Sequence, residues 1–237
     1  KPNRIALSDY RIAPPYHPEQ QDDLMEVAPD FGDSECLTRF TDQAIKWIAS
    51  VADDARRGEP FFLYLPLTSP HKPVIPLEQF RGQGEAGAYG EFMIETDWHL
   101  GRLLSLLDRE NLAENTIVIY TSDNGPENTW KQRIQKFGHH SSGPYREGKR
   151  SIYEGGHRVP FFLRWPARVK PGSRWTEPIC QTDLLATFAA ILNKPLPARS
   201  GEDSISFHRA WSGPKANHPS RPPVIHHAAN GRFAIRA

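Results

Sequence analysis

The chain has 237 residues, of which 38% are hydrophobic, and its 29 basic and 28 acidic residues give a formal net charge of +1. This composition is typical of a globular protein with one sizeable core and excludes a disordered chain. The near-neutral charge excludes recruitment of nucleic acid or of an anionic membrane by a general field, so any bound anion must be held by local contacts.

Residues 1–33 are rich in Pro, Asp and Gln and show no sustained period, which predicts an irregular lead-in segment. A helix is predicted from Ser34, a suitable cap, to about Gly58, because apolar residues recur there at helical spacing. Residues 61–67 form a short and continuously apolar run, which indicates a strand buried on both faces of a parallel sheet.

The same alternation continues along the chain. A second amphipathic helix is predicted over 89–110, followed by an apolar strand over 116–121. Residues 159–165 are a third strand candidate and 182–192 a short helix, after which the pattern weakens near Pro197. The order predicts an α/β fold with a mostly parallel sheet flanked by helices, in which 34–197 form the main domain and 198–237 begin a smaller region.

Polar residues follow two of the predicted strands, where binding sites of such sheets usually lie. The strand over 116–121 runs into Ser122, Asp123, Asn124 and Gly125. A carboxylate beside an amide carbonyl is an oxygen pair suited to Ca²⁺ or Mg²⁺. The alternative is a hairpin turn, since Asn-Gly is its strongest short signal. The polar, broken stretch that follows favours a functional loop.

Residues 138–160 combine many Gly, basic and His residues ahead of an apolar strand. Such a segment suits the binding of a tetrahedral oxyanion by backbone N–H groups and cations. The alternative for Lys149 or Arg146, taken singly, is a solvated surface charge. His139, His140 and His157 lie in the same segment, and the sequence does not say which of them line a pocket.

Several short motifs follow one another along the chain. They are Pro70-His71-Lys72-Pro73, then Glu95, Asp97 and Gly101-Arg102 on the second helix, Asn115 to Val118, Thr121 to Gly125, Gly143 to Lys149, Glu154 to Pro160, and Thr182 to Thr187. Together they resemble the sulfatase family, within the alkaline-phosphatase-like superfold, from about Cys36 to Pro197. The resemblance implies hydrolysis of a sulfate monoester to an alcohol and inorganic sulfate.

The resemblance also implies roles for four residues. Asp123 and Asn124 match the family's pair that binds a divalent cation, usually Ca²⁺, with Mg²⁺ as the alternative. Lys149 and His71 match the residues that hold the sulfate group, and Lys149 also neutralises charge as the ester bond breaks. His71 has an alternative as a hydrogen-bonded core histidine. The implied substrate is a sulfated small molecule or glycan, with no nucleic-acid partner, and the oligomeric state stays open.

The family's nucleophile, a formylglycine made from a Cys or Ser, has no match in this chain. Neither Cys36 nor Cys180 starts the required motif, and neither is spaced for a disulfide framework or a zinc site. The tail Pro219-Ser220-Arg221 follows an Asn and a His, so we interpret it as coincidence in a Pro-rich surface loop. Asp22-Asp23 is a poor substitute for the family's upstream metal ligands.

We therefore expect the chain to begin partway through the enzyme and to be unstable or inactive without the missing part. It starts at Lys1 with no Met and no apolar leader, and no apolar run is long enough to span a bilayer. A periplasmic, secreted or lysosomal location is expected from the resemblance alone. The alternatives to a sulfatase are a phosphonate or phosphodiester hydrolase of the same superfold and an inactive anion-binding fragment.

Overall fold

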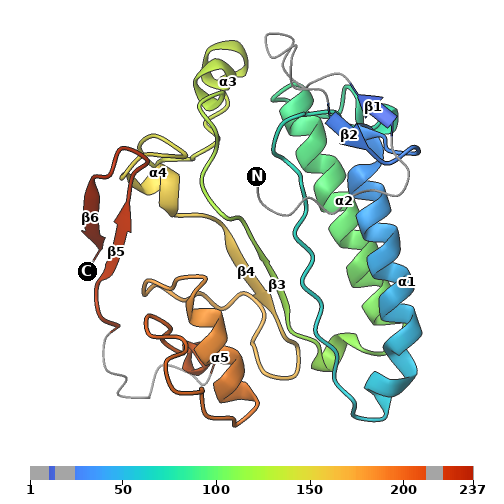
Figure 1. The fold of residues 1–237 in the computed structure, drawn as a ribbon, viewed down its shortest axis with the longest axis vertical. Helices are drawn as coiled ribbons and strands as arrows, with labels where there is room; N and C mark the ends of the chain where they lie inside the picture. The colour runs from blue at the N-terminus through green and yellow to red at the C-terminus, as the bar shows by residue number, and fades with distance from the viewer. Residues whose placement is uncertain (1–10, 14–24, 212–220, 237) are drawn as a thin grey trace. The chain divides into compact units, whose positions relative to one another are not determined.

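The computed structural model describes residues 11–13, 25–211 and 221–236. The described chain divides into two compact units, Lys1–Leu112 and Ala113–Ala237, which are treated separately below (Figure 1). Asp22-Asp23 and residues 217–220 of the formylglycine-like tail lie outside the described residues. Among the helices that are described, none combines enough length and hydropathy to cross a membrane.

Two long helices form the core of the first unit, α1 (Cys36–Arg56) and α2 (Ala88–Arg109), which run side by side in Figure 1. Both helices were predicted from their apolar periodicity, and that prediction is confirmed. The capping role predicted for Ser34 is wrong, because Ser34 lies inside the 3₁₀ turn η1 (Asp33–Glu35) that precedes α1. The buried apolar side chains that α1 and α2 contribute are Leu37, Ala44, Ile48, Ala52, Phe92, Leu106 and Leu107.

The apolar run at 61–67 is extended but is not a paired strand, so the predicted buried strand is absent from the described structure. Its side chains alternate between partly buried and exposed, and Phe62 and Tyr64 are 71% and 77% exposed. A strand is defined by hydrogen bonds to a neighbour, and no described residue provides that neighbour. The segment continues into a 3₁₀ turn, η2 (Glu78–Phe80).

A small two-stranded sheet lies in the segment that was predicted to be irregular. Strand β1 (Arg11–Ala13) pairs in antiparallel register with β2 (Met25–Val27). The polar composition of residues 1–33 gives no alternating pattern long enough to signal strands of three residues, which is why the sequence did not predict them.

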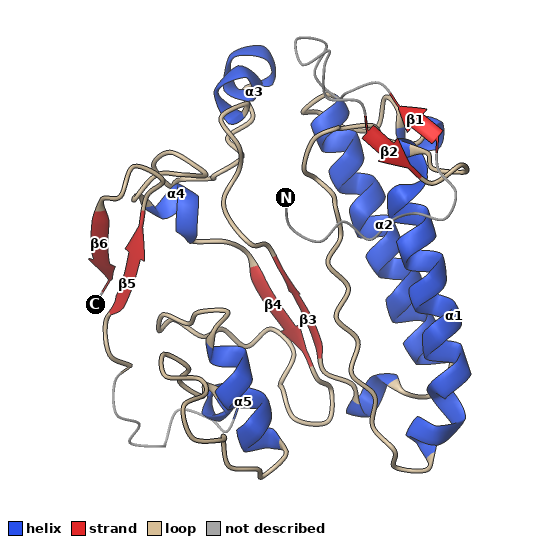
Figure 2. Cartoon of the chain, viewed as in Figure 1, coloured by secondary structure: helices blue, strands red, loops and turns tan. Residues whose placement is uncertain are grey.

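The second unit is built around β3 (Val118–Thr121) and β4 (Phe161–Arg164), at two of the places where strands were predicted. They pair antiparallel, with Thr121 opposite Phe161, and so differ from the mostly parallel sheet that was expected. Every sheet in the described residues is a two-stranded antiparallel one (Figure 2). The connection between β3 and β4 carries the short helices α3 (Trp130–Phe137) and α4 (Glu154–His157).

The remaining elements of this unit follow β4. Helix α5 (Asp183–Ile191) confirms the helix predicted over 182–192. The 3₁₀ turns η3 (Ala113–Asn115) and η4 (His208–Trp211) flank the strands and helix in sequence. Strands β5 (Val224–His227) and β6 (Phe233–Arg236) form a hairpin that the sequence analysis did not predict.

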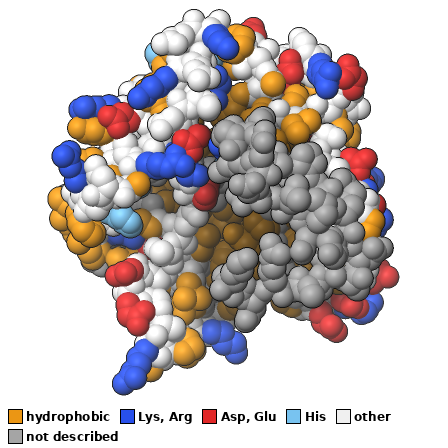
Figure 3. Space-filling view, turned by 45° about the horizontal axis from the view of Figure 1, so that its top comes forward, with side chains coloured by type: hydrophobic (Ala, Val, Ile, Leu, Met, Phe, Trp, Pro, Cys, Tyr) orange, Lys and Arg blue, Asp and Glu red, His pale blue; other side chains and the backbone are white. Residues whose placement is uncertain are grey.

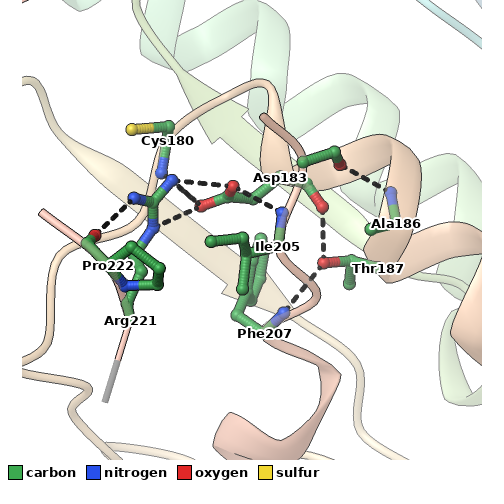
Figure 4. A network of polar contacts seen from close by, with 9 residues as sticks. Cys180, Asp183, Ala186, Thr187, Ile205, Phe207, Arg221 and Pro222 are labelled. Carbon is green, nitrogen blue, oxygen red and sulfur yellow. Dashed lines mark hydrogen bonds and ion pairs between the residues drawn. The ribbon is translucent and has the colours of Figure 1, made fainter. Parts of the chain in front are cut away.

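A buried ion pair ties the start of α5 to the segment just before β5 (Figure 4). Asp183 is 1% exposed, and both its carboxylate oxygens accept hydrogen bonds from Arg221, at 2.9 to 3.1 Å. The same carboxylate accepts from the backbone N–H groups of Cys180 and Ile205. The interpretation of Arg221 as part of a surface loop is therefore wrong: its guanidinium is the partner of a buried carboxylate.

Candidate functional site

The loop after β3 presents the predicted metal-binding pair. The Asp123 side chain is exposed, and the Asn124 side chain is half-buried. Ser122 Oγ donates to Asn124 O at 2.9 Å, and Asn124 Nδ2 donates to Gly125 O at 3.0 Å. The hairpin alternative is wrong, because β3 pairs with β4 rather than with the residues that follow the turn.

Backbone hydrogen bonds join this loop to the segment that carries Lys149. Gly125 N donates to Gly156 O at 3.0 Å, and Lys149 N donates to Pro126 O at 2.8 Å. The Lys149 segment is itself closed by a bond of 2.9 Å from Gly155 N to Arg146 O. Residues about 25 positions apart in the sequence are thus held side by side, and Asp123, Asn124 and Lys149 belong to one connected pair of loops.

Glycine makes this approach possible. A Cβ atom on Gly125 would lie 1.8 Å from Gly155 O, and one on Gly155 would lie 2.0 Å from Glu147 O. A Cβ on Gly148 would meet Pro126 O at 2.4 Å. All three distances are far below van der Waals contact, so the backbone contacts exist only because these positions lack side chains.

Lys149 differs from the cations around it. Arg150 forms an ion pair with Glu127 and holds the pKa of that carboxyl below its usual range by hydrogen bonding. The Arg146 guanidinium lies over the Tyr153 ring, 3.7 Å from its centroid. The half-buried Lys149 forms no ion pair with any residue that the structure describes, although its charge contributes, less than Arg150, to the lowered pKa of Glu127.

Two histidines meet beside the Lys149 segment, and only one of them was considered from the sequence. His157 and His226 have ring centroids 4.3 Å apart. His157 donates to Ser151 O at 2.8 Å and His226 to Ile152 O at 3.0 Å. Partial removal from water, followed by the neighbouring His226, lowers the pKa of His157. His226 was missed because no motif near it indicated proximity to residues 151–157. His139 and His140 are exposed.

His71 lies in the first unit, in the loop between residues 61–67 and η2. Its side chain is exposed, with Nδ1 donating to Lys72 O at 2.8 Å, so the alternative of a core histidine is wrong. Among the described residues of this unit, His99 on α2 is a buried histidine, with 0% of its surface exposed. Asp123, Asn124 and Lys149 lie on the joined loops of the second unit, and His71 belongs to the first unit.

The oxygen atoms of Asp123 and Asn124 fit part of the ligand set of a Ca²⁺ ion. The Asp123 carboxylate has no hydrogen-bond or ion-pair partner among the described residues, and the Asn124 amide uses its nitrogen, leaving the oxygen available. Ca²⁺ takes six to eight oxygen ligands. The described residues hold no group of three or more His, Cys, Asp or Glu placed to bind a metal. The chemistry of Asp123 and Asn124 therefore fits a Ca²⁺ ion, of which the two side chains would supply only some of the ligands.

The family model named Sulfatase matches residues 4–194. The chain belongs to the sulfatase family. It is 36% identical over 207 residues to the N-acetylgalactosamine-6-O-sulfatase of Bacteroides thetaiotaomicron, a match that covers 86% of this chain and 39% of the relative. It is 37% identical over 147 residues to human arylsulfatase A, covering 62% of this chain and 28% of that protein.

Solved structures agree with this assignment. A Bacteroides thetaiotaomicron sulfatase described in connection with glycosaminoglycan metabolism matches with a TM-score of 0.75 at 32% identity, over 86% of this chain and 42% of that one. The PsFucS1 sulfatase from Pseudoalteromonas sp. matches with a TM-score of 0.72 at 28% identity, over 86% and 39% of the two chains. The chain thus spans about two fifths of the length of these relatives.

Proposed function

We propose that the full-length protein hydrolyses a sulfate monoester to an alcohol and inorganic sulfate. The observation that carries this proposal is the pair of backbone hydrogen bonds, Gly125 N to Gly156 O and Lys149 N to Pro126 O, which joins the loop of Asp123 and Asn124 to the segment of Lys149. A cation placed next to a metal-binding pair provides fixed positive charge for an anionic ester whose leaving group gains negative charge.

Within this proposal each residue of the chain has one task. Lys149 binds a sulfate oxygen and offsets the negative charge that develops as the ester bond breaks. His71 binds a second sulfate oxygen. Asp123 and Asn124 hold the divalent cation, most often Ca²⁺ in this family, which supplies a Lewis acid for the sulfate oxygens when bound. The nucleophile in this proposal is the formylglycine of the family, for which the printed sequence has no matching motif.

The substrate class proposed is a sulfated small molecule or a sulfated glycan, since the relatives include an N-acetylgalactosamine-6-O-sulfatase and arylsulfatase A. The enzyme alternative is a phosphonate or phosphodiester hydrolase, which would use the same kind of site. A periplasmic, secreted or lysosomal location is part of the proposal and comes from the family resemblance.

The test is a paired assay of the full-length protein on aryl sulfate and aryl phosphate esters with the same leaving group. We expect a higher kcat/KM on the sulfate ester. Lys149→Ala should lower kcat roughly 10²- to 10³-fold, as loss of one preorganised charge-stabilising group does. Lys170→Ala, which removes an exposed lysine, is the control and should leave kcat unchanged.

Asp123→Ala should raise the concentration of Ca²⁺ needed for half-maximal activity, because it removes a charged oxygen ligand. Activity that prefers the phosphate ester would favour the phosphodiesterase alternative. Unchanged kcat in Lys149→Ala, together with an unchanged Ca²⁺ requirement in Asp123→Ala, would exclude the proposed site.

A further inference from the structure

The loop that carries His71 is attached to α2 near each of its ends. Leu77 N donates to Glu95 Oε2 at 2.8 Å. At the other end, Ser69 Oγ is hydrogen-bonded to Thr96 Oγ1 at 2.8 Å. Glu95 and Thr96 are consecutive residues, so a single turn of α2 holds both ends of the segment that contains His71.

Both anchoring side chains are polar groups in the core. Glu95 is 0% exposed and Thr96 is 1% exposed. Burying a carboxyl or hydroxyl group costs free energy unless hydrogen bonds replace those made to water. An apolar residue at position 95 would serve helix packing at no such cost, so the buried Glu95 carboxyl is explained by the hydrogen bond that it accepts from the loop.

The pKa of Glu95 reflects both its burial and its hydrogen bond to the loop. Burial raises the pKa of Glu95, and its Oε1 atom has no hydrogen-bond partner. His99 Nε2 lies 3.8 Å from Glu95 Oε1, and burial lowers the pKa of His99 to about 4. The hydrogen bond from Leu77 N lowers the pKa of Glu95 by less than burial raises it.

We propose that Glu95 and Thr96 are positioning residues, which hold the His71 loop in the conformation that binds the sulfate group. The inference rests on the function proposed above for His71. Neither residue touches the substrate, and both act through the backbone and side chains of residues 69 and 77.

A matched control exists on the neighbouring helix. Thr41 on α1 is 0% exposed and donates to the carbonyl four residues earlier, Leu37 O, at 2.9 Å. Thr96 makes the equivalent bond to Phe92 O at 2.7 Å and differs by its additional contact with Ser69. Thr96→Val and Thr41→Val therefore remove the same intrahelical bond, and only Thr96→Val releases the loop.

The experiment measures amide hydrogen exchange over residues 68–77, together with KM and the inhibition constant of inorganic sulfate, in the full-length protein. Thr96→Val should speed exchange in this loop and raise KM and the sulfate inhibition constant roughly five- to tenfold, the effect of one hydrogen bond. Thr41→Val should change neither. Thr96→Ser, which keeps the hydroxyl, should restore wild-type values.

Glu95 provides a second pair of variants. Glu95→Gln keeps an acceptor for Leu77 N and should retain anion binding, whereas Glu95→Leu should lose it while the protein remains folded. Equal exchange and equal kinetic constants in Thr96→Val and Thr41→Val would overturn the inference. A wild-type protein that hydrolyses no sulfate ester would instead refute the proposed function. The amide exchange of residues 68–77 and the affinity for inorganic sulfate would still show whether Glu95 and Thr96 hold the loop.

Discussion

A side chain as small as that of alanine does not fit at Gly125. Its Cβ would lie 1.8 Å from Gly155 O, a backbone atom that cannot rotate away. Gly125→Ala should therefore break the hydrogen bond to Gly156 and separate the two site loops. We expect a loss of about 2 kcal/mol or more in the free energy of unfolding, with a larger fall in kcat/KM.

Gly101→Ala is the control, because Gly101 lies on an exposed face of α2 with open space where the Cβ would be. Alanine there should stabilise the helix by about 0.5–1 kcal/mol. Denaturant unfolding and steady-state kinetics of both variants check this prediction. A Gly125→Ala enzyme with normal kinetics would show that the contact between the loops does not matter to the site.

His99 should make the protein sensitive to acid. Burial, and secondarily Arg102, lower its pKa from 6.5 to about 4 in the folded state. Between pH 6.5 and pH 4 the unfolded chain binds a proton at His99 and the folded state does not. The contribution of His99 to stability is therefore complete above pH 6.5 and is lost as the pH falls toward 4. The loss should amount to roughly 2 to 3 kcal/mol. Glu95, whose pKa is raised, acts in the opposite direction.

The measurement is the free energy of unfolding at pH 7.5 and pH 4.5 for wild type, His99→Gln and His140→Asn. Replacing His99 removes its contribution and leaves that of Glu95, so His99→Gln should lose less stability on acidification than wild type. The exposed His140 serves as control and should behave as wild type. Identical pH dependence in all three proteins would refute the role of His99.

Helix α5 depends on the buried pair of Asp183 and Arg221. Arg221→Ala would leave a carboxylate that is 1% exposed with only backbone N–H partners. Breaking one side of a buried pair costs about 3–5 kcal/mol. Arg221→Lys should rescue little, because lysine cannot give two parallel N–H bonds to one carboxylate. Thermal unfolding checks this, with the exposed Arg174→Ala as control; a midpoint equal to that of the control would contradict it.

The hairpin of β5 and β6 shows what a turn signal needs in order to predict an element. Asn230-Gly231 lies between two short strands that pair from Val224 to Arg236, and Gly231 has φ of +79°. Asn124-Gly125 has the same letters but is followed by polar residues and α3, so no hairpin forms. The difference lies in the flanking strands, and the missed signal was Asn230-Gly231 between the short apolar runs Val224-Ile225 and Phe233-Ala234-Ile235.

At the scale of the molecule, local periodicity predicted the long helices, and order of motifs predicted the family. Neither could predict the partners of a strand, because pairing depends on residues distant in sequence. The apolar run at 61–67 therefore has the composition of a buried strand without a described neighbour, and β3 pairs antiparallel. For the site, the order of the motifs predicted Asp123, Asn124 and Lys149. The hydrogen bond between Gly125 and Gly156 that joins their loops could not be predicted, because it links residues distant in sequence.

The extended segment at 61–67 predicts how the isolated chain behaves. Phe62 and Tyr64 are largely exposed, as is Phe162 on β4 at 64%. Among the described residues seen in Figure 3, basic and acidic side chains are intermingled, so their charges provide little net repulsion against association. The isolated chain should bind a hydrophobic dye and self-associate in light scattering, whereas the full-length protein should do neither. A monodisperse chain that binds no dye would contradict this.

The central claim is that Lys149 and Asp123 serve one site, and a double-mutant cycle on kcat/KM for a sulfate ester tests it most directly. If both residues stabilise the same transition state, the fold-losses of kcat/KM in Lys149→Ala and Asp123→Ala should not multiply. The kcat/KM of the double variant should then lie within about tenfold of that of the less active single variant. Losses that multiply in full would show that the two residues act independently and would contradict a shared site.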